Sequence, residues 1–219
     1  ALAAALACYA ATGEVRIRLA TKAADPAAAR AKMAPLERAI RERFGDFIFG
    51  YDGDTLESVV ARMLWDRGLT LAVAESCTGG LVSHRLTNIP GSSRFLLASV
   101  VSYSNESKVD LLGVDPGIIA SHGAVSARTA EAMSAGVRAV SGADIGISTT
   151  GIAGPEGGTP EKPVGLVFVG LSDGAGTLSR QYNFYGDRIR IKERAAQACL
   201  NLLRLRLLSA GTPETRNPG

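Results

Sequence analysis

A serine and a cysteine stand side by side in the segment AVAESCTGG, residues 72–80. The segment reads as a buried strand that turns into a helix, and such a turn exposes side chains at the carboxyl end of a sheet, where α/β folds bind ligands. Ser76 is therefore a candidate nucleophile, although a plain capped helix explains the local pattern equally well. Cys77 is the weaker candidate, because its apolar surroundings favour a buried thiol.

The residues around this pair suggest how an anion could be bound. Backbone N–H groups at a helix start lack intrahelical acceptors, and glycines let a ligand approach the backbone closely. The amides of Thr78, Gly79 and Gly80 are thus candidates for holding an oxyanion or a phosphate. We expect Glu75 to orient a lysine or a ribose, or only to solvate the strand end.

A lysine is the natural candidate for the base. The two histidines, His84 and His122, have no marked partners, so no Ser-His-Asp set is convincing. Lys108 follows Tyr103, which ends a predicted strand, and Ser–Lys pairs are a known nucleophile–base combination. The pKa of Lys108 would have to fall from about 10.4 to roughly 7–8, which burial can achieve. A solvated surface lysine is the alternative.

Three further stretches carry candidate binding residues. Ser93 lies in a Pro-Gly turn, where it could hold a phosphate or an amide, or only cap the turn. Thr150 and Gly151 end a predicted strand and enter a loop rich in glycine and proline. Such loops are often functional, although a surface hairpin is the simpler interpretation. Arg188 stands at a helix start, where the helix dipole disfavours a cation, so it is a candidate for binding an anion.

Strand and helix patterns alternate from residue 54 onward, and these elements must position the candidates. We expect strands at 69–75, 95–104, 144–155, 164–172 and 178–185, helices at 54–68, 78–89, 105–113, 126–143 and 187–210, and a loop at 115–124. This alternation predicts an α/β fold, a three-layer sandwich with a mixed, mostly parallel sheet.

The first 52 residues predict a small α+β piece that precedes the sandwich. We expect a strand at 13–23, a helix from Asp25-Pro26 to Gly45 and a strand at 46–52. The alanine-rich opening lacks an initiator methionine, and we expect it to be cut inside a helix of a larger protein. The predicted divisions are 1–52, 53–210 and a disordered tail at 211–219.

The composition excludes several classes of protein. Of the 219 residues, 46% are hydrophobic and 21% charged, as in ordinary globular proteins, and a net charge of +3 is too mild to indicate nucleic-acid binding. The three cysteines form no CxxC pair, which favours a reducing compartment and argues against structural zinc. No apolar run reaches the roughly 18–20 residues of a membrane span. We expect a cytoplasmic protein with no metal, membrane or nucleic-acid partner.

The motifs AESCTGG, PGSS, YSNESK, SHGAVS, TTGIAGPEGGTPEKPVG and GDR occur in this order. Together they strongly resemble the CinA family, in its carboxy-terminal domain of the nicotinamide-nucleotide amidohydrolase (PncC) type. The resemblance covers about residues 54–208. Residues 13–52 are similar to the end of the linker domain that precedes it in long CinA proteins. We expect the amino-terminal, molybdopterin-binding-like domain of those proteins to be missing here.

The resemblance implies hydrolysis of the carboxamide of nicotinamide mononucleotide (NMN) to nicotinate mononucleotide and ammonia, a step of pyridine nucleotide recycling, without a cofactor. In this reading Ser76 is the nucleophile, Lys108 the base and Tyr103 a relay. The oxyanion or phosphate would be held by the amides of Thr78, Gly79 and Gly80, and the nucleotide positioned by Ser93, Thr150, Gly151 and Arg188.

Some alternatives stay open at the level of sequence. The sequence does not decide whether Ser76 or Ser93 is the nucleophile. A non-catalytic nucleotide-binding or regulatory module in competence or DNA-damage response is the second functional reading. We expect a homo-oligomer. The chain also departs from the family pattern at two places: Ala98-Ser99 stands where Gly-Gly is frequent, and Lys192 stands where a second arginine follows GDR.

Overall fold

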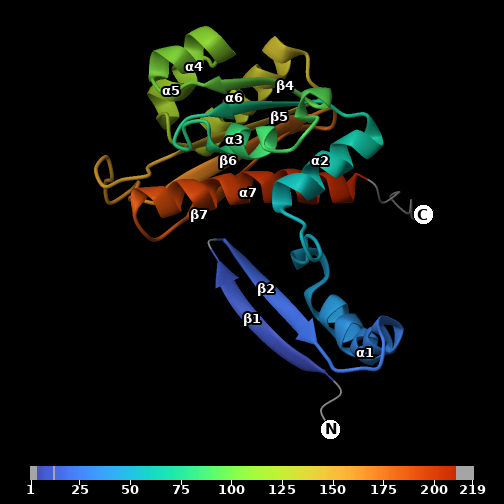
Figure 1. Ribbon diagram of the computed structural model, residues 1–219. Helices are drawn as coiled ribbons and strands as arrows, with labels where there is room; N and C mark the ends of the chain where they lie inside the picture. Colours follow the sequence, from blue (N-terminus) through green and yellow to red (C-terminus); the bar gives the residue numbers. More distant parts are fainter. Residues whose placement is uncertain (1–3, 12, 211–219) are drawn as a thin grey trace, which may run out of the picture. The chain divides into compact units, whose positions relative to one another are not determined.

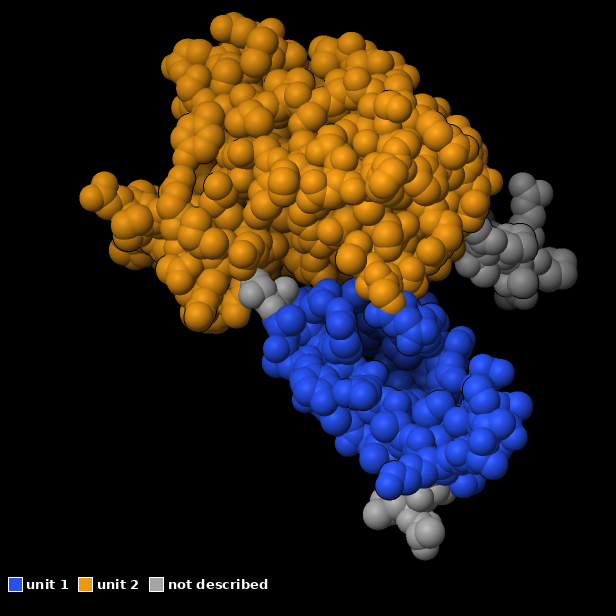
Figure 2. Space-filling model, in the orientation of Figure 1, with its two compact units in different colours: residues 1–52 blue, residues 53–219 orange. Residues whose placement is uncertain are grey.

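The computed structural model describes residues 4–11 and 13–210, so the predicted tail at 211–219 lies outside the described residues. The chain forms two compact units, unit 1 with residues 1–52 and unit 2 with residues 53–219 (Figures 1 and 2). None of the helices in the described ranges combines the length and the apolar character that a membrane span requires.

Unit 1 is a hairpin followed by a helix. Strand β1 (Ala5–Ala11) pairs antiparallel with β2 (Glu14–Ala20), and α1 (Pro26–Phe44) follows. Asp25 caps α1 by accepting a hydrogen bond from the Ala28 amide at 2.8 Å.

Two predictions for unit 1 are wrong. Residues Ala5–Ala11 of the alanine-rich opening form β1 instead of a helix, because pairing with β2 outweighs the helix propensity of alanine. Residues 46–52 contain no strand: the chain makes a short 3₁₀ turn, Gly45–Phe47, and continues without regular structure. No strand among the described residues pairs with this segment.

Unit 2 is built on a five-stranded mixed sheet, as predicted. Its strands are β3 (Leu71–Glu75), β4 (Leu96–Val101), β5 (Ile145–Gly151), β6 (Leu166–Asp173) and β7 (Gly176–Asn183), in the order β4-β3-β5-β6-β7. β4, β3 and β5 run parallel, whereas β6 and β7 are added antiparallel. All five residues of β3 are buried, which explains its apolar sequence.

Helices cover both faces of this sheet (Figure 1). Their bounds are α2 (Leu56–Arg67), α3 (Leu81–Thr87), α4 (Asn105–Leu112), α5 (Pro116–His122), α6 (Ala127–Ser141) and α7 (Arg188–Ser209). α6 packs on the sheet with α4 and α5 beside it, and α7 packs on the sheet with α2 and α3 beside it. Together with the sheet, these helices make the three layers.

The loop predicted at 115–124 is wrong, because α5 occupies most of it. Asp115 accepts a hydrogen bond from the Gly117 amide at 2.7 Å, and Pro116 opens the helix. An Asp-Pro pair is a helix-start signal, and the glycines at 117 and 123 hid it in the sequence.

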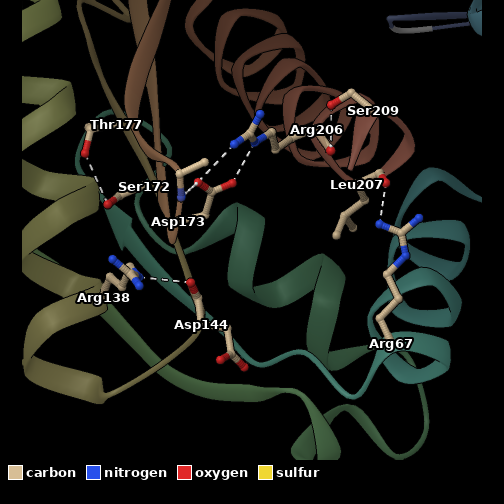
Figure 3. A network of polar contacts seen from close by, with 10 residues as sticks. Arg67, Arg138, Asp144, Ser172, Asp173, Thr177, Arg206, Leu207 and Ser209 are labelled. Carbon is tan, nitrogen blue, oxygen red and sulfur yellow. Dashed lines mark hydrogen bonds and ion pairs between the residues drawn. The ribbon is translucent and has the colours of Figure 1, made fainter. Parts of the chain in front are cut away.

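A polar network fixes the carboxyl end of α7 (Figure 3). Arg206 makes two hydrogen bonds to the carboxylate of Asp173 at the end of β6, at 2.6 and 3.1 Å. Arg67, the last residue of α2, donates to the carbonyl of Leu207. Because β6 is antiparallel to β5, this network lies near the amino ends of the parallel strands.

Most of the candidate residues lie at the opposite end of the sheet, where the parallel strands have their carboxyl ends. Glu75 is in register with Val101 of β4 and with Thr149 of β5, so the three parallel strands end together. Ser76, Tyr103 and Thr150 therefore lie at or near the carboxyl ends of these parallel strands.

Candidate active site

The turn after β3 holds Ser76 at the carboxyl ends of the parallel strands. Its amide donates to the Thr149 carbonyl at 3.0 Å, and its own carbonyl accepts from the Gly79 amide at 3.1 Å. Gly79 and Gly80 have φ angles of 61° and 95°, which L side chains rarely adopt, so this turn requires its two glycines. The side chain of Ser76 is held in a nearly closed environment, with 9% of its surface exposed.

The structure brings Ser76 and Lys108 together, as the sequence suggested. Lys108 lies on α4 and is only 1% exposed. Its Nζ is 3.2 Å from Ser76 Oγ, and it also donates to the carbonyls of Ser102, Tyr103 and Ser104 at 2.9, 3.3 and 3.2 Å. Burial lowers the pKa of Lys108, and the neighbouring Cys77 and Glu106 only partly oppose this effect.

This arrangement suits a reversible proton transfer. A neutral amine has two N–H donors and one lone pair. If carbonyls around Lys108 accept the two N–H groups, the lone pair is left for the hydroxyl proton of Ser76. The same carbonyl dipoles stabilise the ammonium that forms after transfer.

Glu75 has a structural role that its sequence position did not reveal. Its fully buried carboxylate accepts hydrogen bonds from the amides of Gly80, Val82 and Ser83, at 2.9, 3.1 and 2.8 Å. α3 begins at Leu81 and not at residue 78, so the carboxylate caps the helix. The amide of Gly80 is therefore engaged by Glu75 and does not fit the role of a ligand donor.

The amides that remain for a ligand are those nearest the serine. Gly79 donates to the Ser76 carbonyl, whereas the amides of Cys77 and Thr78 have no acceptor among the described residues. The hydroxyl of Thr78 is hydrogen-bonded to that of Thr149 at 2.7 Å, which ties the turn to β5. Sequence reasoning named Thr78 but missed Cys77 as an amide donor, and it missed Thr149.

The hydroxyl of Tyr103 contacts Arg188 and not Lys108. The phenol is 57% exposed and accepts a hydrogen bond from Arg188 at 2.8 Å, and Arg188 also donates to the Gly154 carbonyl at 2.8 Å. Only the backbone carbonyl of Tyr103 contacts Lys108. Arg188 thus links the end of β4 to the glycine-rich loop, and the relay expected of Tyr103 has no direct path in this arrangement.

Thr150 and Gly151 hold neighbouring segments together. The buried hydroxyl of Thr150 donates to the Ala124 carbonyl at 2.7 Å. A β-carbon on Gly151 would come within 2.7 Å of the Leu166 carbonyl oxygen, so close packing against β6 accounts for this glycine. Both residues lie at the expected edge but serve packing contacts there.

Lys162 completes the attachment of the glycine-rich loop. Its Nζ donates to the carbonyls of His122 and Val125 at 2.7 and 2.9 Å. Sequence reasoning did not single out Lys162. The signal was its place in the motif TTGIAGPEGGTPEKPVG, which pairs here with the motif SHGAVS.

Ser93 lies far from the serine and lysine of its own chain. It is exposed in the 3₁₀ turn Ser92–Arg94, which precedes β4. Phe95, which follows this turn, accepts a hydrogen bond from the amide of Leu71, the first residue of β3. Ser76, in contrast, follows the last residue of β3. The length of β3, roughly 17 Å at about 3.3 Å per residue, therefore separates Ser93 from Ser76 within one chain.

Lys192 places a positive charge over the turn. A β-carbon on Gly79 would lie 3.6 Å from its Nζ. The side chain is half-buried and makes no hydrogen bond or ion pair with another described residue. It lies one helical turn after Arg188 on α7, so the two cations share a helix face. This corner of the edge is suited to an anionic group.

Cys77 is an inert thiol in this setting. It is buried, and burial raises its pKa to about 12, so it is almost entirely protonated near neutrality. We expect Cys77→Ala to keep catalytic turnover within about threefold of wild type, since only packing is altered. Treatment with iodoacetamide should likewise leave activity intact. Loss of activity on alkylation of Cys77, located by peptide mass spectrometry, would contradict this assignment.

The described residues contain no group of three or more His, Cys, Asp or Glu side chains that could hold a metal ion. The groups that the described residues bring to the carboxyl ends of the parallel strands are a hydroxyl, an amine, two backbone amides and two cations.

Comparisons with known proteins identify the same regions. The CinA C-terminal domain matches residues 53–207, and the Damage-inducible protein CinA KH domain matches residues 3–50, the stretch expected to belong to a linker domain. A CinA-like protein of Syntrophus aciditrophicus is 49% identical over 200 residues, which are 91% of this chain and 47% of that protein. A CinA-like protein of Geobacter metallireducens is 47% identical over 195 residues, 89% of this chain and 47% of its own.

The solved structures agree with these relatives. A competence/damage inducible protein from Agrobacterium tumefaciens has a TM-score of 0.66 and 37% identity, and the match covers 73% of this chain and 99% of that one. A competence-damaged protein (CinA) superfamily protein from Enterobacter cloacae has a TM-score of 0.67 and 34% identity, covering 72% and 96%. The chain spans about half the length of the curated relatives it matches. On the match over residues 53–207, the chain belongs to the CinA family.

Proposed function

We propose that unit 2 hydrolyses the carboxamide of NMN to nicotinate mononucleotide and ammonia. The observation that carries the proposal is the buried amine of Lys108, 3.2 Å from the hydroxyl of Ser76. A buried lysine with a lowered pKa can act as a base near neutrality, and a serine beside it can act as a nucleophile. Family membership is consistent with this chemistry.

In the first step Ser76 Oγ attacks the carboxamide carbon, and its proton passes to Lys108 Nζ. A C–O bond forms, and the electron pair of the carbonyl double bond moves onto the oxygen. The free amides of Cys77 and Thr78 are adjacent in sequence to the nucleophile and donate to this oxyanion. A donor of this kind contributes a factor on the order of 10²–10³ in turnover.

In the second step the Lys108 ammonium returns its proton to the amide nitrogen. The C–N bond breaks and ammonia leaves, and the nicotinate is held as an ester on Ser76. Water then attacks the ester carbon while Lys108 takes one of its protons and passes it to Ser76 as the ester bond breaks. Nicotinate mononucleotide leaves and the free serine is restored, so one water is consumed for each ammonia released.

Lys192 and Arg188 provide the positive charge for the nucleotide phosphate. We expect Lys192→Met to raise the KM for NMN about tenfold, since one charge-assisted contact is lost, with little change in kcat. The KM for nicotinamide riboside, which has no phosphate, should not change. Arg128→Met removes an exposed cation on α6 and serves as the control. Equal effects of Lys192→Met on both substrates would contradict the assignment.

The activity is tested on the wild-type chain with NMN. Ammonia is measured with a coupled dehydrogenase, and nicotinate mononucleotide is measured by mass spectrometry in ¹⁸O-labelled water. The expected product carries one ¹⁸O in its carboxylate, because the second oxygen comes from water. Thermal stabilisation by NMN without ammonia release would reject the amidase and indicate a binding module instead.

A further inference from the structure

Another buried serine, Ser102, directly follows β4 and lies beside Lys108. It is fully buried, and its Oγ has no hydrogen-bond partner among the described residues. Its carbonyl, in contrast, accepts a hydrogen bond from the Lys108 amine at 2.9 Å. A buried hydroxyl without a partner costs free energy, and native proteins contain few of them. The unpaired Oγ therefore points to a partner that the side chain does not reach in this conformation.

The pairing of β3 with β4 places Ser102 beside Ser76. Glu75 is in register with Val101, and the amide of Ser102 donates to the Glu75 carbonyl at 2.9 Å. The next residues along the two strands are Ser76 and Ser102. They are therefore neighbours, on strands that lie about 4.8 Å apart.

The two serine side chains lie on the same face of the sheet. Side chains alternate along a strand, so Ser76 follows the row of Ala74, and Ser102 follows the row of Val100. Ala74 and Val100 pack in one core cluster, which also contains Leu112 of α4. Both hydroxyls therefore belong to the face that α4 covers, the helix that carries the lysine.

The surroundings of the Lys108 amine are rich in acceptors and poor in donors. The carbonyls of Ser102, Tyr103 and Ser104 accept from Nζ at 2.9, 3.3 and 3.2 Å. An ammonium has three N–H groups, so three carbonyls can satisfy it. A neutral amine also has a lone pair, and a carbonyl cannot donate to a lone pair. In the free chain the hydroxyl of Ser76, 3.2 Å from Nζ, can be this donor.

The ester stage of the proposed reaction removes that donor. Once Ser76 Oγ is bonded to the acyl carbon it has no proton to donate, yet the hydrolytic step requires a neutral amine that can take a proton from water. An amine that is surrounded by carbonyls and has no donor is prone to bind a proton from solvent, and it then has no lone pair. A second hydroxyl that donates to Lys108 opposes this loss.

We propose that the Ser102 hydroxyl turns about its Cα–Cβ bond and donates a hydrogen bond to the lone pair of the Lys108 amine while Ser76 is esterified. Ser102 is thus a positioning residue, which keeps the amine neutral and in place until the hydrolytic water arrives. A change between staggered side-chain positions is sufficient, because Nζ already lies 2.9 Å from the carbonyl oxygen of the same residue. The role assigned to Ser102 rests on the proposed amidase.

The charged groups around the amine stay the same when Ser102 is changed. Cys77, on the turn after β3, and Glu106, on α4 itself, act on the Lys108 amine. Cys77 is protonated near neutrality, and Glu106 is exposed. The charged residues of α6, which packs against α4, are engaged elsewhere, as the pair Arg128–Glu131 and as Arg138, which donates to the Asp144 carbonyl. A change in the titration of Lys108 therefore reports the hydroxyl.

The first test measures the amine without turnover. Ser76→Ala removes the serine donor, as esterification does, and the pKa of Lys108 is followed through its ¹³Cε chemical shift in labelled protein. The pKa of Lys108 in Ser76→Ala/Ser102→Ala should be about one pH unit higher than in Ser76→Ala, because the neutral amine loses a hydrogen bond. Ser134→Ala in the same background removes a buried hydroxyl on α6 and should leave this pKa unchanged. An unchanged or lower pKa in the double variant overturns the proposal.

The stability of Ser102→Ala tests whether the hydroxyl is unpaired in the free chain. The variant should be as stable to urea as wild type or more stable, because it removes a buried hydroxyl that has no partner there. A marked loss of stability would mean that the hydroxyl already has a partner in the free chain, and it would contradict the proposal.

The last test uses turnover of NMN by wild type and Ser102→Ala. The value of kcat/KM reports the steps up to ester formation, in which Ser76 still has its proton, so it should stay within about twofold. The kcat at pH 7 should fall about tenfold and approach that of wild type as the pH rises, because hydrolysis of the ester requires the neutral amine. The ester on Ser76, trapped by acid quench, should accumulate in the variant.

The kinetic outcomes separate this role from a structural one. Equal losses of kcat and kcat/KM in Ser102→Ala, with no accumulation of the ester, would indicate a structural role and reject the proposal. An inactive wild type would reject the amidase alone, because the titration of Lys108 tests the contact between hydroxyl and amine without turnover.

Discussion

Replacing Ser76 with alanine is expected to lower the turnover of NMN by a factor on the order of 10⁴–10⁶, because the atom that bonds to the amide carbon is lost. The backbone of the turn should remain in place, since Ser76 holds Thr149 and Gly79 through main-chain bonds. The measurement is kcat from the rate of ammonia release. NMN should still bind, with a Kd within about threefold of wild type.

The control for this substitution is a second buried serine. Ser134→Ala removes a hydroxyl that donates to the Glu131 carbonyl within α6 and faces no substrate group, so activity should stay within about twofold. If Ser76→Ala retained a tenth or more of the wild-type rate, the serine could not be the nucleophile. The ester should also be trapped from wild type, but not from Ser76→Ala, by rapid acid quench and mass spectrometry.

Replacing Lys108 with methionine is expected to lower kcat by a factor on the order of 10³–10⁵, because the hydroxyl of Ser76 loses its proton acceptor. Burial lowers the pKa of Lys108, so its neutral form is populated at a lower pH than for an exposed lysine. The kcat of wild type should therefore rise with pH and level off below the ordinary lysine pKa of about 10.4. Lys108→Arg keeps a similar length and charge but stays protonated, so it should not rescue activity.

Unfolding measurements give Lys108 a second readout. Between its lowered folded-state pKa and about 10.4, the unfolded chain binds a proton that the folded chain does not, so wild-type stability gains a contribution that grows as pH rises. Below the folded-state pKa the cost of burying the charge is present in full. Lys108→Met should lack this gain when urea unfolding at pH 7 and pH 10 is compared. The same pH dependence in both proteins would indicate that Lys108 is not titrating as inferred.

The sequence predicted the pair at the site because each member depends on a local pattern. Ser76 follows an apolar strand, and Lys108 lies early in a helix that follows the next strand. The carboxyl ends of neighbouring parallel strands meet at one edge, so the two side chains had to converge once the strands were adjacent. The alternation of strand and helix patterns sufficed to predict the three-layer sandwich, because each of these elements also depends on a local pattern.

The remaining features depend on contacts between distant residues or on competing local signals. Glu75 bonds to amides five to eight residues later, and its position in the sequence leaves open whether it orients a lysine or a ribose or only solvates the strand end. The opening strand follows from pairing with β2, which the alanine-rich composition does not reveal. Thr150 ends a strand, and this position predicts a side chain that faces a ligand. Its contact with Ala124 requires knowing that the segment before α6 lies over β5.

The length of α7 has a consequence for substrate affinity. The helix has 22 residues and is about 33 Å long, with Arg188 and Lys192, the cations proposed to bind the phosphate, in its first two turns and the Arg206–Asp173 ion pair near its last. α7 packs against the sheet, α2 and α3 along its length and is tied to β6 by Arg206 near its carboxyl end, and these contacts set the position of Lys192 beside the turn at Gly79. Substitutions at the Arg206–Asp173 ion pair should therefore change the affinity for the nucleotide through the position of Lys192. The geometry of Ser76 and Lys108, which is held by β3 and α4, should stay the same.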